Sequence, residues 1–135
     1  PPGDGQQMGR SRRLSRPAQR DRRAGYPMLV TVLLCFCACP DAPTAARIAE
    51  ALVAERLAAC ASALPGMRST YRWQGAVQHA DEVLLLIKTS AGRYPALQSR
   101  LPQLHPYELP ELLAVEAGTG LPDYLRWVAD ATRPD

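Results

Sequence analysis

The sequence predicts an α+β domain on the ferredoxin-like plan: a βαββαβ order, an antiparallel sheet of four strands, and an extra C-terminal helix. Apolar runs typical of strands alternate with stretches of helical periodicity in the order strand, helix, strand, strand, helix, strand. Right-handed crossovers would place two helices on one face of the sheet. With 135 residues, 47% of them hydrophobic, the chain can form one domain with one core.

The first strand is expected over Met28–Phe36, a continuous apolar run typical of a strand covered on both faces. Residues 37–43 then form a loop, in which Asp41 can cap the next helix and Pro43 suits its first turn. That helix is expected to run to about Ala59, because apolar residues recur at helical spacing.

A long hairpin should follow. Its first strand covers residues 60–73, and Pro65-Gly66 indicates a bulge or kink within it. Gln74-Gly75 predicts the turn, and the return strand runs over about residues 76–89. Strands of this length overhang their own sheet, so the outer part of the hairpin needs a partner, and a neighbouring subunit is the expected one.

Three further elements complete the plan. A second helix follows Ser90 and continues to about Leu104, with Pro102 expected to kink or shorten its last turn. A short apolar strand is expected over Leu112–Val115, and a final helix over about residues 121–132.

The net charge of +3 is unevenly distributed. Residues 1–27 hold seven arginines and two aspartates, a charge of +5, so residues 28–135 carry −2. The first 27 residues are expected to be a disordered basic tail, because their composition cannot bury a core. One interpretation is a mistaken start upstream of Met28. The domain itself, residues 28–135, gives no reason to expect nucleic-acid binding.

A targeting signal is the alternative for the arginines that precede the first apolar run. That run is too short to span a membrane and serves equally well as a buried strand. We therefore expect a cytoplasmic protein that does not associate with membranes. In such a reducing compartment the four cysteines would remain free thiols, and Cys35, Cys37 and Cys39 would share one face if the strand continues through them.

The segment His105-Pro106-Tyr107-Glu108-Leu109-Pro110-Glu111 places an imidazole, a phenol and carboxylates between two prolines. Each proline restricts the residue before it to an extended conformation, which favours a rigid, non-helical segment. Such a segment is either a binding element or a connector. The chain also lacks the G-x-x-x-x-G-K and H-E-x-x-H patterns, so no enzymatic activity is expected.

Several ordered motifs carry a family resemblance. They are Cys39-Pro40-Asp41, Glu55-Arg56-Leu57-Ala58-Ala59-Cys60-Ala61, Leu64-Pro65-Gly66, Tyr71-Arg72-Trp73-Gln74-Gly75, Ile87-Lys88-Thr89, His105–Glu111 and Tyr124-Leu125-Arg126-Trp127. With them, residues 28–132 resemble the CutA-type divalent-cation tolerance proteins. The resemblance implies a homotrimer with PII-like architecture, joined through the long hairpins, and a role in tolerance of copper and other divalent metals.

The resemblance also implies metal ligands, which in this sequence are Cys37, His105 and Glu111. A thiolate and an imidazole suit a copper or a zinc ion. A fully extended segment would, however, separate His105 and Glu111 by roughly 20 Å, so a shared site needs a sharp turn or another subunit. One alternative is that Glu111 and Tyr107 bind polar groups across a subunit cleft. Another is that His105 and Glu111 satisfy buried backbone groups at a subunit junction.

Two functional hypotheses result. The first is a non-enzymatic trimer of copper tolerance that binds copper weakly or transiently. The second is a PII-like signalling or scaffold trimer that binds a small polar ligand or a partner protein in clefts between subunits. Tyr107, Lys88 and Trp73 are the candidate cleft residues, although the sequence favours hairpin or interface packing for Trp73.

Overall fold

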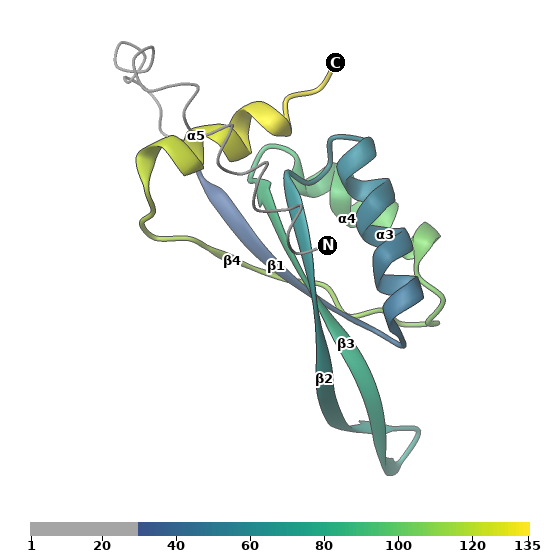
Figure 1. The fold of residues 1–135 in the computed structure, drawn as a ribbon. Coiled ribbons are helices and arrows are strands. Elements are labelled where there is room, and N and C mark those ends of the chain that lie inside the picture. Colours follow the sequence, from purple (N-terminus) through teal and green to yellow (C-terminus); the bar gives the residue numbers. More distant parts are fainter. Residues whose placement is uncertain (1–29) are drawn as a thin grey trace. The chain divides into compact units, whose positions relative to one another are not determined.

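The computed structural model describes residues 30–135, and the helices and strands of this part of the chain lie within Thr31–Asp135. Four antiparallel strands form one sheet in the order β2-β3-β1-β4 (Figure 1). Along the chain the elements follow as β1, α3, β2, β3, α4, β4 and α5. The predicted α+β class, antiparallel sheet and element order are confirmed. The predictions for residues 1–27 and for Met28 lie outside the described residues.

Strand β1 spans Val32–Cys39, so the prediction of a loop from residue 37 was wrong. The strand pairs with β3 along its full length, and Cys35, Cys37 and Cys39 are all fully buried. Because side chains alternate along a strand, the three thiols form one row on one face. Burial of these small apolar side chains favours continuation of the strand through Cys39. The strand ends before Pro40, because proline has no N–H to donate to a neighbouring strand.

Helix α3 spans Ala42–Ala54. It begins as predicted, because the Asp41 carboxylate accepts a hydrogen bond of 2.8 Å from the Thr44 N–H. It ends at Ala54 and not near Ala59, so the predicted end was wrong. Arg56 adopts a left-handed φ of 61°, which turns the chain toward the sheet at a position where the sequence offers no glycine or proline stop.

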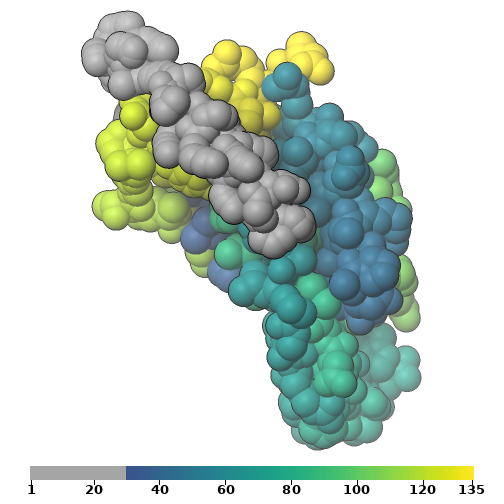
Figure 2. Space-filling view, viewed as in Figure 1, coloured from purple at the N-terminus to yellow at the C-terminus, as the bar shows by residue number. Residues whose placement is uncertain are grey.

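The hairpin joins β2, Cys60–Trp73, to β3, Ala76–Ser90. The predicted bulge is confirmed, because the pairing register shifts between Leu64 and Met67. The turn is also confirmed: Gln74 and Gly75 both have positive φ, 52° and 82°, as a type I′ turn requires. Beyond the end of β1 the two strands continue as a two-stranded arm that extends away from the sheet (Figures 1 and 2).

Helix α4 spans Tyr94–Leu104 and includes Pro102, so the proline does not shorten its last turn as we expected. The His105 N–H closes that turn on the Leu101 carbonyl at 3.0 Å. Strand β4, Leu113–Glu116, and helix α5, Pro122–Ala131, lie within one residue of their predicted bounds.

The core lies between the sheet and the helices α3 and α4, which cover the same face of the sheet (Figure 1). The opposite face is covered less completely. Helix α5 places Val128 against Val32 at one end of it. Further along this face, Leu64, Leu113 and Val115 remain exposed. No helix within residues 30–135 has the length and apolar character needed to cross a membrane.

Candidate functional site

His105 is the residue from which the candidate site is built. It lies at the end of α4, where Pro106 holds it in an extended conformation with φ −93° and ψ 137°. Its side chain is 7% exposed and reaches the end of β1, where Nε2 lies 2.8 Å from the Ala38 carbonyl oxygen. The rigid proline-rich segment therefore directs an imidazole onto the central strand.

The hydrogen bonds of His105 define its tautomer. The Tyr107 backbone N–H donates to Nδ1 at 3.1 Å, so Nδ1 must be the unprotonated nitrogen. Nε2 then carries the hydrogen and donates it to the Ala38 carbonyl. Both ring nitrogens are thus occupied by backbone groups of the same chain, and the predicted subunit junction stays a prediction.

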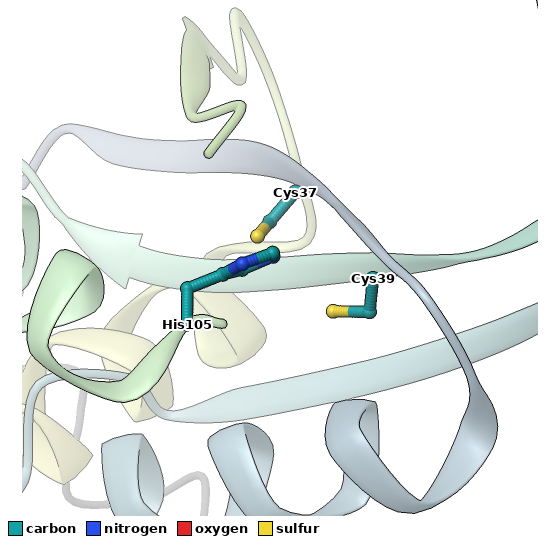
Figure 3. Close-up of side chains that lie close together, drawn as sticks. All are labelled: Cys37, Cys39 and His105. Carbon is teal, nitrogen blue, oxygen red and sulfur yellow. The ribbon is translucent and has the colours of Figure 1, made fainter. Parts of the chain in front are cut away.

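Two thiols lie beside this ring. The sulfurs of Cys37 and Cys39 and a ring nitrogen of His105 all lie within 4.8 Å of one another, and Figure 3 shows both sulfur atoms directed toward the imidazole. The alternation of β1 brings the two cysteines to the same face, and the residue that follows α4 is the histidine. The structure therefore brings Cys37 and His105 together and adds Cys39, and a role of these residues as metal ligands stays a prediction.

The two thiols differ electrostatically. The hydrogen bond with Cys39, burial, and the nearby carboxylates of Glu111 and Glu82 all raise the pKa of Cys37. The same hydrogen bond lowers the pKa of Cys39, against the effect of burial. Burial alone raises the pKa of Cys35, two residues before Cys37 on the same face, to about 11. The hydrogen bond between the two thiols therefore shifts their pKa values in opposite directions.

This donor set fits a soft metal ion, because two sulfurs converge on one point and thiolate ligands favour Cu(I) or Zn. His105 fits less well as a ligand. Coordination through Nδ1 would leave the Tyr107 N–H without its acceptor, and coordination through Nε2 would remove the donor to Ala38. Cys37 and Cys39 are the residues that could hold an ion, and His105 fixes the strand between them.

Glu111 is not part of this group of ligand atoms. It lies instead in a pocket of about 740 Å³ between the hairpin arm and the segment 106–111. Tyr107 and Trp73 line the same pocket, so two of the three predicted cleft residues come together there. The predicted ligand roles of these residues stay predictions.

Lys88, the third predicted cleft residue, lies elsewhere. Its ammonium group donates to the Cys60 sulfur at 3.6 Å and to the Ser62 hydroxyl at 3.4 Å on β2. These three residues lie on the sheet face opposite to α3 and α4, as the pairing of Cys60 with Lys88 requires.

Sequence reasoning missed Glu82, which is 8% exposed and accepts a hydrogen bond of 2.6 Å from the Tyr107 hydroxyl. A glutamate at the start of an apolar run gives no signal of burial. It also missed Cys39 as a neighbour of His105, although the alternation of three cysteines was the signal that could have found it.

Comparisons with known proteins agree with this architecture. Residues 33–131 match the family model described as CutA1 divalent ion tolerance protein. The chain belongs to this family. The divalent-cation tolerance protein CutA of Thermus thermophilus is 46% identical over 93 residues, which are 69% of this chain and 90% of that protein. The protein of the same name from Pectobacterium atrosepticum is 41% identical over 105 residues, 78% of this chain and 96% of that one.

A solved structure gives the same result for the fold. The crystal structure of CutA from Xylella fastidiosa superposes with a TM-score of 0.74 at 51% identity, and the match covers 76% of this chain and 98% of that one. The names of these CutA relatives describe cation tolerance and mention no catalysed reaction. The matched range includes both cysteines of the cluster, His105 and the pocket residues.

Proposed function

We propose that this CutA-family chain is a non-enzymatic, cytoplasmic protein of divalent-cation tolerance that binds copper weakly or transiently as a PII-like homotrimer. One observation carries the metal proposal: the convergence of Cys37, Cys39 and His105 within 4.8 Å. Bound copper would be held as a thiolate complex, which sequesters the ion. Family membership supports the link to metal tolerance.

The protein's own residues account for weak or transient binding. Both sulfurs are fully buried, so an ion can reach them only when the end of β1 opens locally. The His105 bridge to the Ala38 carbonyl, between the two cysteines, opposes that opening. Part of the binding free energy is therefore spent on displacing packed structure.

The trimer is proposed from the surface of the single chain. Within residues 30–135 the hairpin arm has no third strand beyond the end of β1, and it carries an exposed Val77. Leu113 and Val115 on the edge strand β4 are also exposed. Apolar edges and faces of this kind need a cover, and copies of the same chain can supply it. Light scattering should give three times the chain mass of 14.7 kDa; a monomer at micromolar concentration would contradict the proposal.

The metal proposal is tested by calorimetric titration with Cu(I) under anaerobic conditions, and with Cu(II) and Zn(II). We expect Cys37→Ser and Cys39→Ser each to weaken Cu(I) binding at least about tenfold, since each removes one soft ligand. Cys35→Ser is the matched control, because Cys35 is equally buried on the same strand and face but lies outside the cluster. Binding that is unchanged by both cluster variants would refute the site.

A PII-like signalling or scaffold trimer is the second candidate function. The pocket of about 740 Å³ favours it, because this volume lies in the range of small-molecule sites. A ligand screen by thermal shift tests this candidate, since a ligand that binds the folded state raises its melting temperature.

A further inference from the structure

The pocket beside the hairpin arm has an unusual lining. On one side lie residues 69–73 of β2, and on the other lies the proline-held segment that contains Tyr107, Glu108 and Glu111. Glu82 of β3 contributes to the lining between them. Two rigid elements therefore form the walls, so the pocket exists before any ligand arrives, which lowers the entropic cost of binding.

The charge of the pocket is negative. Three carboxylates, those of Glu82, Glu108 and Glu111, line it with one guanidinium, that of Arg72. No ion pair within residues 30–135 joins Arg72 to any of these carboxylates. The pocket is thus complementary to a cation.

Glu82 gives the strongest indication of a missing partner. Its side chain is 8% exposed, and one oxygen accepts the Tyr107 hydroxyl at 2.6 Å. No hydrogen bond or ion pair of the described part of the chain involves its other oxygen, Oε1. A buried carboxylate without a cationic partner is costly. The negative charge of Glu82 also acts on Glu111: burial and this charge together raise the pKa of Glu111.

Aromatic side chains stand next to these carboxylates. Glu82 pairs with Met67 across the hairpin, and Tyr71 and Trp73 follow Met67 on the same face by alternation. Both line the pocket, together with Tyr107. Aromatic ring faces attract cations, and they contact apolar methyl and methylene groups as well.

A bare metal ion fits this lining poorly. Among residues 30–135, three metal-binding side chains converge within 4.8 Å only at Cys37, Cys39 and His105, so the carboxylates of the pocket do not form a preorganised cage. The pocket volume of about 740 Å³ also lies in the range of sites that bind small organic molecules.

We propose that this pocket binds an organic ammonium cation, with Glu82 and Glu111 facing its positive charge and Tyr71 and Trp73 contacting its alkyl groups. The inference concerns the ligand of the second candidate function and does not depend on the thiol cluster. It rests on charge, burial and aromatic lining within one chain.

The first experiment uses the full chain in its solution state and compares choline with 3,3-dimethyl-1-butanol by calorimetry. These probes share their shape and differ in charge, so the comparison isolates the electrostatic contribution. We expect choline to bind at least about tenfold more tightly than the neutral alcohol. Equal binding of the two, or no binding of choline because a neighbouring subunit fills the pocket, would overturn the proposal.

The second experiment uses variants. Glu82→Gln keeps an acceptor for the Tyr107 hydroxyl but removes the charge, and should weaken choline binding at least about tenfold. Trp73→Leu, at a partly exposed position, should weaken it as well and does not depend on a buried charge. Glu50→Gln is the matched control, because Glu50 is an exposed residue of α3 outside the pocket and the substitution removes the same charge. This variant should bind choline as tightly as the natural chain does.

Two further results decide between proposals. Cys37→Ser should retain choline binding, which separates failure of the pocket proposal from failure of the metal proposal. The other result is competition by Ca²⁺. If Ca²⁺ displaces choline from the natural chain but not from Glu82→Gln, the occupant is an inorganic cation, and the proposal for an organic one is overturned.

Discussion

Removal of the His105 side chain should destabilise the fold whether or not metal is present. The change His105→Ala deletes the donor to the Ala38 carbonyl at 2.8 Å and the acceptor of the Tyr107 N–H at 3.1 Å. Each hydrogen bond contributes about 0.5–1.5 kcal/mol net, and a buried backbone group left unpaired costs about 1–3 kcal/mol. With the lost packing of a side chain that is 7% exposed, we expect a loss of about 3 kcal/mol in the free energy of unfolding.

Two conservative variants separate the bonds. His105→Asn places an oxygen near the position of Nδ1 and can still accept the Tyr107 N–H. His105→Gln places a nitrogen near the position of Nε2 and can still donate to Ala38. Each should lose about half as much stability as His105→Ala, because each retains one of the two bonds.

The measurement is urea unfolding at one fixed protein concentration with a chelator present, because association and bound metal both add to apparent stability. A loss below about 0.5 kcal/mol in His105→Ala would show that the two bonds do not carry the role assigned to them. Equal losses in all three variants would show that ring packing, and not hydrogen bonding, fixes the segment.

Three further predictions concern other parts of the chain. Burial and the Glu82 charge raise the pKa of Glu111 in the folded state above its usual 4.5. The folded state therefore loses stability as the pH rises from the unfolded pKa of this carboxyl to its folded pKa. Glu111→Gln should raise the melting temperature at pH 7, where the carboxyl would be charged, but not at pH 4. Gly75→Ala should cost about 1–2 kcal/mol because φ is 82°, whereas Gly92→Ala, where a Cβ meets nothing within 4 Å, should be close to neutral in urea unfolding. Tyr107→Phe should cost about 1.5–3 kcal/mol, since it removes the donor to the buried Glu82 carboxylate, and its cost in a Glu82→Gln background should be smaller if that bond is responsible.

Local signals in the sequence account for most of the fold. The hairpin turn could be predicted because Gly75 accepts a positive φ without strain and stands between two runs of strand-forming residues. The N-terminus of α3 could be predicted because an aspartate stands at the capping position. The end of α3 could not be predicted, because the left-handed residue that ends it is Arg56 and not the glycine or asparagine that usually takes this conformation. That conformation closes the helix as a Schellman motif, in which the Leu57 N–H donates to the Leu52 carbonyl at 2.9 Å and the Arg56 N–H to the Val53 carbonyl at 3.1 Å.

The site was less accessible to sequence reasoning. Cys37 and His105 came from a family resemblance, but the two bonds that occupy the imidazole are made to backbone groups, which leave no trace in a sequence. The position of Glu111 depends on how the proline-held segment turns, and a fully extended segment was only a limiting case. Burial of Glu82 arises because Tyr107, distant in sequence, covers it and donates to it.

Tyr107 links the two candidate sites physically. Its backbone N–H donates to His105, which fixes the strand between the two thiols, and its hydroxyl donates to Glu82 in the pocket. A cation that draws the Glu82 carboxylate toward itself acts against the hydroxyl bond, and a metal ion that opens the end of β1 acts against the His105 bridge. Both ligands therefore affect the position of the same residue. Binding free energies linked in this way are reciprocal, so any factor by which choline changes the affinity for Cu(I) must equal the factor by which Cu(I) changes the affinity for choline.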